Sequence, residues 1–233
     1  MNPSYPHRIR LRGPWECEPI SSRNEAPLPS PRRMKMPARW KDAGLPDFAG
    51  KVRFRRRFGY PGQLDEDERA WLVFEAIHGD GLIRLNDSEL GEIQEGFFDF
   101  EVTSLLNPRN ELILDIEADE DGGIVGDVAL EIRRTAFLRE VYGSYDKSSR
   151  ELTVTGLAIG ESERPLDLYL AGHQETLGYT TIEPTAEGRR FELRTEPIEL
   201  DKHSEFLRIE LVDAATVWYM IGVVLSLPFE EQH

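Results

Sequence analysis

Alternation of apolar and polar residues recurs along the chain and constrains its fold more than any other feature. Residues 69–112 show it most clearly, as several short runs with an apolar residue at every second position, separated by turn-forming residues. A period of two places successive side chains on opposite faces of a strand. Helical periodicity is nearly absent, and we expect one short helical turn, at residues 103–106, capped by Thr103 and ending before Pro108. The sequence therefore predicts an all-β protein.

The strand pattern divides near residue 135. A length of 233 residues allows one large all-β domain or two smaller ones. Seven further candidate strands follow the division, at residues 137–142, 151–157, 166–171, 176–182, 189–195, 205–212 and 217–227. Such regular spacing is typical of an immunoglobulin-like sandwich. We expect domains at residues 1–135 and 136–233, and a long irregular connection at residues 19–46, which are rich in Pro, Ser and Arg.

Charge is unevenly spread along the chain. Residues 1–60 carry 14 Lys and Arg against 5 Asp and Glu, whereas the remainder carries 14 against 38. Such asymmetry can mark a nucleic-acid-binding face. In residues 51–58, however, alternation places Arg53, Arg55 and Arg57 on one face of a strand, where they can oppose acidic residues of the same molecule. We expect no nucleic-acid partner, because most of this acidic surface would repel a phosphate backbone.

The sequence contains no segment with the character of a membrane span or a secretory leader. The longest strongly apolar run, residues 218–227, is far shorter than the roughly 20 residues of a spanning helix. Residues 1–12 lack the apolar region of a signal peptide. The single cysteine, Cys17, cannot form an internal disulfide and fits a small core residue of a strand. We therefore expect a cytoplasmic protein with no membrane contact.

An ordered series of short motifs runs through residues 8–134. The motifs are Gly-Pro-Trp, Met-Pro-Ala-Arg-Trp, Phe-Arg-Arg-Arg-Phe, Arg-x-x-Leu-x-Phe-Glu, Asn-Asp before Leu-Gly, Phe-Asp-Phe-x-Val-Thr-x-Leu-Leu, Asn-x-Leu, and Gly-Gly-Ile before Val-x-Leu. They lie at residues 13–15, 36–40, 54–58, 69–75, 86–91, 98–106, 110–112 and 122–130. Their order resembles the amino-terminal jelly-roll domain of glycoside hydrolase family 2, the β-galactosidase and β-glucuronidase group. Gly126 stands where that family usually has an arginine.

The resemblance implies a galactose-binding-like jelly roll followed by an immunoglobulin-like β-sandwich. In that family the catalytic residues lie in a separate (β/α)8 barrel of roughly 250 residues, for which this chain has no room. The family presents its catalytic acid in an Asn-Glu pair at the end of a barrel strand, whereas Asn24-Glu25 falls in a loop and Asn110-Glu111 opens a sandwich strand. We therefore expect a non-catalytic protein that is not an enzyme.

Two tryptophans are candidates for carbohydrate binding. A sugar needs an aromatic platform for its apolar face and polar groups for its hydroxyls. Trp40 follows the long connection with Arg39 and Asp42 beside it, and Trp71 alternates with core-directed residues and should face away from the core. Packing is the competing interpretation for both, with Trp40 fixing its loop to the sandwich and Trp71 lying under the second domain.

Asp119 and Asp121, in the run Asp-Glu-Asp-Gly-Gly, are candidate calcium ligands, because calcium takes six to eight hard oxygen ligands. A solvated acidic turn is the alternative. No zinc, P-loop, dinucleotide-binding or nucleophile-elbow motif is present, so we expect no other cofactor. Two functions stay open. One is a saccharide-binding module, and the other is a protein-interaction scaffold that pairs with a separate catalytic chain or with itself as a homo-oligomer.

Overall fold

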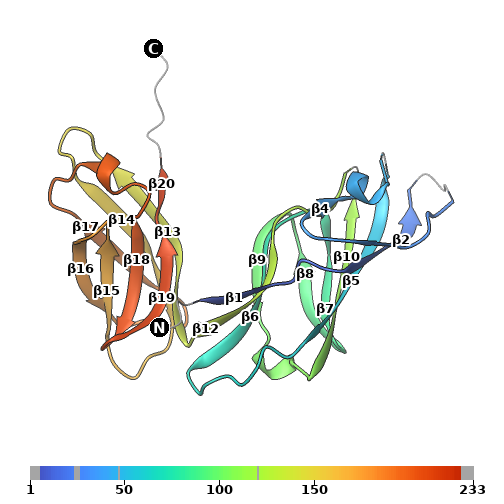
Figure 1. The fold of residues 1–233 in the computed structure, drawn as a ribbon, viewed down its shortest axis with the longest axis horizontal. Coiled ribbons are helices and arrows are strands. Elements are labelled where there is room, and N and C mark those ends of the chain that lie inside the picture. Colours follow the sequence, from blue (N-terminus) through green and yellow to red (C-terminus); the bar gives the residue numbers. More distant parts are fainter. Residues whose placement is uncertain (1–5, 24–26, 47, 120, 227–233) are drawn as a thin grey trace, which may run out of the picture. The chain divides into compact units, whose positions relative to one another are not determined.

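The computed structural model describes residues 6–23, 27–46, 48–119 and 121–226. Within these residues the regular elements are β-strands and three short 3₁₀ helices, η1 (Trp40–Ala43), η2 (Thr103–Leu105) and η3 (Leu200–Lys202) (Figure 1). The all-β prediction is confirmed. None of the helices in the described residues has the length and apolar character needed to cross a membrane.

The chain forms two compact units. Among the described residues, the first unit contains residues 8–65 and 69–132, and the second contains residues 6–7, 66–68 and 133–226. Residues 66–68 therefore belong with the carboxy-terminal half although they lie within the amino-terminal half of the sequence. A single boundary in the sequence therefore cannot describe the two units.

The first unit is a jelly roll of two six-stranded sheets. One sheet contains β1 (His7–Arg10), β4 (Ala38–Arg39), β6 (Glu68–His78), β9 (Gly96–Glu101), β11 (Gly123–Ile124) and β12 (Val128–Arg134). Their order is β1-β12-β6-β11-β4, and β9 also pairs with β6. The other sheet contains β2 (Trp15–Ser22), β3 (Arg32–Met34), β5 (Gly50–Gly59), β7 (Asp80–Leu85), β8 (Ser88–Ile93) and β10 (Arg109–Ala118). Its order is β3-β2-β5-β10-β7-β8.

The alternating apolar residues of these strands form the core of the jelly roll. On β5, Val52 and Phe54 are fully buried, and antiparallel pairing with β10 places them opposite Ile116 and Leu114. Cys17 on β2 lies on the other side of Phe54 and is also buried. Burying each large apolar side chain contributes about 1.5–3 kcal/mol. The strand pattern of the sequence therefore corresponds to one continuous core.

The basic face of β5 is neutralised by its neighbours in the sheet. Arg53 donates two hydrogen bonds, of 2.7 and 2.8 Å, to the carboxylate of Asp115 on β10. Arg57 donates to Glu111, also on β10, at 2.9 Å, and Arg55 lies 3.5 Å from the carboxylate of Glu16 on β2. The arginine run therefore pairs with acidic residues of the same unit, as the alternation predicted.

The second unit contains two four-stranded sheets. One has the order β17-β14-β13-β20 and the other the order β16-β15-β18-β19 (Figure 1). The strands of the first are β13 (Ala136–Tyr145), β14 (Leu152–Gly160), β17 (Arg189–Arg194) and β20 (Val224–Ser226). Those of the second are β15 (Leu166–Ala171), β16 (Thr176–Ile182), β18 (Arg208–Asp213) and β19 (Thr216–Gly222). The predicted strands at 166–171 and 176–182 match β15 and β16.

Two other expectations are wrong, those for the connection at residues 19–46 and for the cap at Thr103. Residues 19–46 are not an irregular connection throughout, because they include the end of β2, then β3, β4 and η1. Pro19 is tolerated within β2 because the register shifts between Pro19 and Ser21, where a missing backbone N–H disturbs no regular ladder. Thr103 does not cap η2, since its Oγ1 accepts the backbone N–H of Ala70 at 2.9 Å.

Candidate functional site

Three strands of the jelly roll bring Arg39 and His78 into one row. In the short strand β11, Gly123 pairs with Arg39 of β4 on one side and with His78 of β6 on the other. Gly123 has a φ of 149°, and a Cβ at this position would lie 2.6 Å from the carbonyl oxygen of Ala38. Because no side chain separates them, Arg39 Nη1 and His78 Nδ1 approach to 3.2 Å. The glycine is thus a geometric requirement of the site.

Trp40 anchors the segment that carries Arg39. Its backbone N–H donates to the carbonyl of Gly122 at 2.8 Å, and its ring packs so closely on Gly122 that a Cβ there would lie 2.7 Å from Cζ2. The ring also meets Phe48 edge to face, with centroids 5.4 Å apart. Trp40 is fully buried. The prediction that Trp40 is a sugar platform is wrong, because the ring is inaccessible, and its packing role explains its place beside the Gly-Gly turn.

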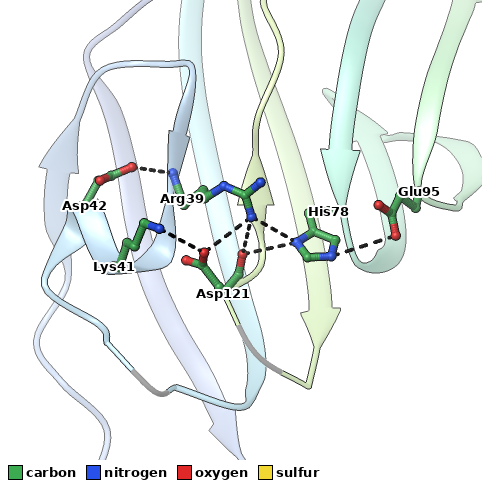
Figure 2. A network of polar contacts seen from close by, with 6 residues as sticks. All are labelled: Arg39, Lys41, Asp42, His78, Glu95 and Asp121. Carbon is green, nitrogen blue, oxygen red and sulfur yellow. Dashed lines mark hydrogen bonds and ion pairs between the residues drawn. The ribbon is translucent and has the colours of Figure 1, made fainter.

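Asp121 connects the cations of the site (Figure 2). Its Oδ2 lies 3.3 Å from both Arg39 Nη1 and Lys41 Nζ. Its backbone carbonyl lies 3.5 Å from Arg39 Nη1 and 3.3 Å from His78 Nδ1. On the far side of the imidazole, His78 Nε2 lies 3.8 Å from Glu95 Oε2 in the turn between β8 and β9. We call Arg39, Lys41, Asp42, His78, Glu95 and Asp121 the polar cluster.

Asp42 has a local role in this cluster. Its Oδ2 accepts the backbone N–H of Arg39 at 2.8 Å, closing the start of η1 over Trp40. One carboxylate oxygen is therefore committed to holding the backbone that presents Arg39. The contact of Arg39 and Asp42 with a sugar stays a prediction.

Trp71 lies apart from the polar cluster. It is half-buried on β6, opposite Glu101 of β9, on the other face from the core residue Leu72. It lies seven positions before His78, which at about 3.3 Å per residue corresponds to roughly 23 Å along the strand. The two predicted tryptophans therefore do not share a site, and a sugar contact at Trp71 stays a prediction.

The acidic turn pairs with cations. Asp119 forms an ion pair with Arg23, and Asp121 pairs with Arg39 and Lys41. Within the described ranges no group of three or more His, Cys, Asp or Glu side chains is arranged to hold a metal ion. The prediction of calcium at Asp119 and Asp121 is not supported, because their carboxylates face arginine and lysine.

His78 and Glu95 are the residues that sequence reasoning missed. The end of a strand near residue 78 is predictable from alternation, but its neighbours in the sheet are not. Only the order β6-β11-β4 places His78 beside residues 39 and 123. The Gly-Gly-Ile motif is the one available signal, since two adjacent glycines indicate close backbone approach.

The side chains of the polar cluster are partly exposed. The exposed fraction is 32% for the Asp121 side chain, 59% for Lys41 and 68% for Glu95. Its carboxylates each face a different partner: the backbone of Arg39, the Arg39 and Lys41 cations, and the His78 ring. They converge on no common point where an acid and a base could act together. The cluster offers donors and acceptors side by side.

Comparisons with known proteins identify the fold. No protein-family model matches the chain, and no curated protein matches it. Several solved structures match the chain. A proposed β-galactosidase from Bacteroides fragilis has a TM-score of 0.71 at 14% identity, and the match covers 93% of this chain and 41% of that one. A Ruminococcus gnavus β-glucuronidase in complex with D-glucuronic acid has a TM-score of 0.68 at 15% identity, covering 96% and 47%. The chain spans less than half the length of these glycosidases, and it shares the all-β fold of that part.

Proposed function

We propose that this chain is a non-catalytic accessory module that binds a neutral saccharide through the polar cluster of its jelly roll. Two facts support the accessory role. The fold is that of a part of β-galactosidases and β-glucuronidases, and the chain corresponds to less than half of their length. The described residues are strands and short 3₁₀ helices, which form two sandwiches.

One observation supports the binding role: donors and acceptors lie side by side at the polar cluster and are partly exposed. Arg39 and Lys41 supply N–H donors, Asp121 and Glu95 supply acceptor oxygens, and His78 can supply either. Each sugar hydroxyl donates one hydrogen bond and accepts others. A surface with both kinds of group within a few ångströms therefore suits a ligand rich in hydroxyls better than one with donors or acceptors alone.

Charge favours a neutral ligand. The cluster contains two cations, Arg39 and Lys41, which both pair with Asp121, and two further carboxylates, those of Asp42 and Glu95. An added anion has to compete with Asp121 for the same two cations. A neutral sugar can insert hydroxyls without displacing either ion pair. We therefore expect neutral saccharides to bind more tightly than the corresponding uronic acids.

Glycan binding by the purified chain tests this proposal. An array that includes neutral oligosaccharides and uronic-acid oligosaccharides identifies a ligand, and calorimetry then gives its dissociation constant. Arg39→Ala should weaken binding by about 10- to 100-fold, since charge-assisted hydrogen bonds contribute about 1.5–3 kcal/mol. His78→Ala should weaken it by about 2- to 10-fold, since ordinary hydrogen bonds contribute about 0.5–1.5 kcal/mol. Arg10→Ala is the matched control, because Arg10 is exposed on β1 of the same unit and pairs with Asp127.

The control and the folding check decide the interpretation. Each variant must first retain the thermal unfolding midpoint of the wild type within a few degrees. If Arg39→Ala and His78→Ala bind as tightly as Arg10→Ala, the saccharide site is not at the polar cluster. If no glycan binds the wild type at all, the protein-partner hypothesis takes its place.

A further inference from the structure

The outer face of the sheet β16-β15-β18-β19 carries a group of tyrosines and carboxylates. Cross-strand pairing places Tyr179 of β16 opposite Tyr169 of β15, and Tyr169 opposite Glu210 of β18. Figure 1 shows these strands as neighbours in one sheet of the second unit. The adjacent row contains Asp167, again on β15. Directly opposed residues of neighbouring strands lie on one face, so two phenol rings and two carboxylates share this surface.

The two tyrosines form a fixed and accessible aromatic surface. Tyr179 is 54% exposed, and its ring centroid lies 5.0 Å from that of Tyr169 with the planes inclined by 42°. The Tyr179 hydroxyl donates to Asp167 Oδ1 at 2.9 Å, which restrains the ring at its polar end. This hydrogen bond to Asp167 is also the main reason that the pKa of Tyr179 is raised, so the phenol stays neutral at physiological pH.

Polar groups border the rings on the side of β18. Arg208 Nε donates to Glu210 Oε1 at 2.6 Å, and both side chains are half-buried. With Tyr169 and Val217 they line a groove of about 560 Å³, which residues 171–176 also line. The His173 ring of this lining packs on Phe206, which restrains it, with centroids 4.4 Å apart. The groove is therefore bounded by restrained side chains.

A pyranose sugar has the complementary chemistry. One face of its ring presents C–H bonds, which are attracted to the negative face of an aromatic ring, and its rim presents hydroxyls. Tyr179 and Tyr169 supply the aromatic faces, and Asp167, Glu210 and Arg208 supply acceptors and donors beside them. Three carboxylates in this area, those of Asp167, Glu175 and Glu210, outnumber the two cations, Arg208 and the Lys202 ammonium that interacts with Glu175, which disfavours an anion. The ligand that fits is a neutral sugar ring.

We propose that the Tyr169–Tyr179 face of the second unit is a saccharide-binding surface, on which a neutral pyranose ring stacks against Tyr179 while its hydroxyls contact Asp167, Glu210 and Arg208. This surface is distinct from the polar cluster and uses ring stacking, which the polar cluster lacks because Trp40 is buried. The two sites share a ligand class, and each can be present without the other.

The test uses the full chain and a panel of neutral oligosaccharides, with calorimetry on the strongest binder. Tyr179→Ala should weaken binding at this surface at least tenfold, because it removes the exposed ring. Tyr179→Phe keeps the ring and should stay within about threefold of the wild type. Tyr142→Ala is the matched control: Tyr142 lies on β13 in the other sheet and is 53% exposed, so its loss should leave binding unchanged.

A second measurement does not depend on the stability of a variant. In wild-type protein labelled with 3-fluorotyrosine, titration with the oligosaccharide should shift the ¹⁹F resonances of Tyr169 and Tyr179 and leave that of Tyr142 in place. Resonances are assigned from single Tyr→Phe variants. Unchanged resonances of Tyr169 and Tyr179 at saturating ligand would overturn the proposal.

The two saccharide proposals fail separately. Loss of binding in Arg39→Ala and His78→Ala with none in Tyr179→Ala supports the polar cluster and overturns the tyrosine surface. Loss in Tyr179→Ala alone supports the tyrosine surface and overturns the polar cluster. Two independent binding events, each removed by its own variant, support both, and a panel in which no saccharide binds overturns both.

Discussion

Gly123 is the residue on which the geometry of the polar cluster depends. Substitution Gly123→Ala brings a Cβ to 2.6 Å from the Ala38 carbonyl at a φ of 149°, so β11 has to move away from β4. We expect a loss of about 1–3 kcal/mol in the free energy of unfolding. We also expect weaker saccharide binding, because Arg39 and His78 no longer meet across the strand.

Urea denaturation and calorimetry measure the two effects of Gly123→Ala. Gly59→Ala is the control, since Gly59 has an ordinary φ and its nearest neighbouring atom would lie 4.0 Å from the new Cβ. The control should be close to neutral. Equal stability of the two variants would show that the close approach at Gly123 is not a constraint.

The Cys17 thiol provides a pH-dependent prediction. Burial raises its pKa from 9.0 to about 11, outweighing the lowering effect of Arg32. The folded pKa exceeds the unfolded one, so this contribution to stability is complete below pH 9 and is lost as the pH rises towards 11. At pH 10.5 the wild type should have lost about 2 kcal/mol relative to Cys17→Ala, at about 1.4 kcal/mol per pKa unit.

Urea unfolding of the wild type and Cys17→Ala at pH 7.5 and pH 10.5 measures this loss. Taking the difference between the two proteins removes the tyrosines and lysines that titrate in the same range. A difference that is the same at both pH values would contradict the assignment of Cys17 as a protonated core thiol.

Single residues also show what could be predicted from the sequence. The pairing of the β5 arginines followed from alternation, because alternation decides which face a side chain takes. Cys17 was expected in the core because a lone cysteine on a strand is most often a small buried residue. The burial of Trp40 could not be predicted in this way, because it depends on Gly122, which is 82 positions away in the sequence. A tryptophan beside charged residues has the same local pattern whether it is a platform or a packing residue, and only tertiary contacts distinguish the two.

At the scale of elements, the pairing of β5 with β10 includes a charged contact that we expect to matter for stability. Asp115 accepts hydrogen bonds from Arg53 and, at 3.2 Å, from Arg84 of β7, so one carboxylate ties together three strands. Its side chain is 8% exposed, which leaves little access for water to replace a lost partner. Asp115→Asn should therefore lower the free energy of unfolding by about 2–4 kcal/mol.

Glu111→Gln is the matched substitution on the same strand. Glu111 pairs with Arg57, but its side chain is 36% exposed, and exposed ion pairs contribute about 0–1 kcal/mol. Chemical denaturation of both variants gives the comparison. A loss at Asp115 no larger than that at Glu111 would mean that burial does not strengthen this contact.

Strands were predictable where alternation has a clear beginning and end, as in β15 and β16. The predicted strand at 217–227 is instead two elements, β19 and β20, which belong to different sheets. The apolar character of the sequence continues across Gly222 and Val223, so nothing local marks the change of sheet. Sheet membership depends on partners elsewhere in the chain, and for the same reason the polar cluster could not be assembled from the sequence.

At the scale of the whole molecule, the proposed saccharide binding can be separated from hydrolysis, because the two need different arrangements of carboxylates. Retaining hydrolysis requires two carboxyl groups about 5–5.5 Å apart with one held protonated. In the polar cluster, Asp42 holds a backbone N–H, Asp121 is held between two cations, and Glu95 faces His78. The three carboxylates face three different partners, so they do not form the facing pair of acid and nucleophile that retaining hydrolysis needs.

We therefore expect p-nitrophenyl β-galactoside and β-glucuronide to be hydrolysed by the purified chain no faster than by heat-denatured protein. The same preparation should bind a neutral oligosaccharide, which shows that it is folded and separates binding from catalysis. If hydrolysis above background is found, Asp121→Asn and Glu95→Gln decide its origin. Activity abolished by either variant would make the polar cluster a catalytic site, whereas activity unchanged in both would have to come from another surface or from a contaminating enzyme, which further purification removes.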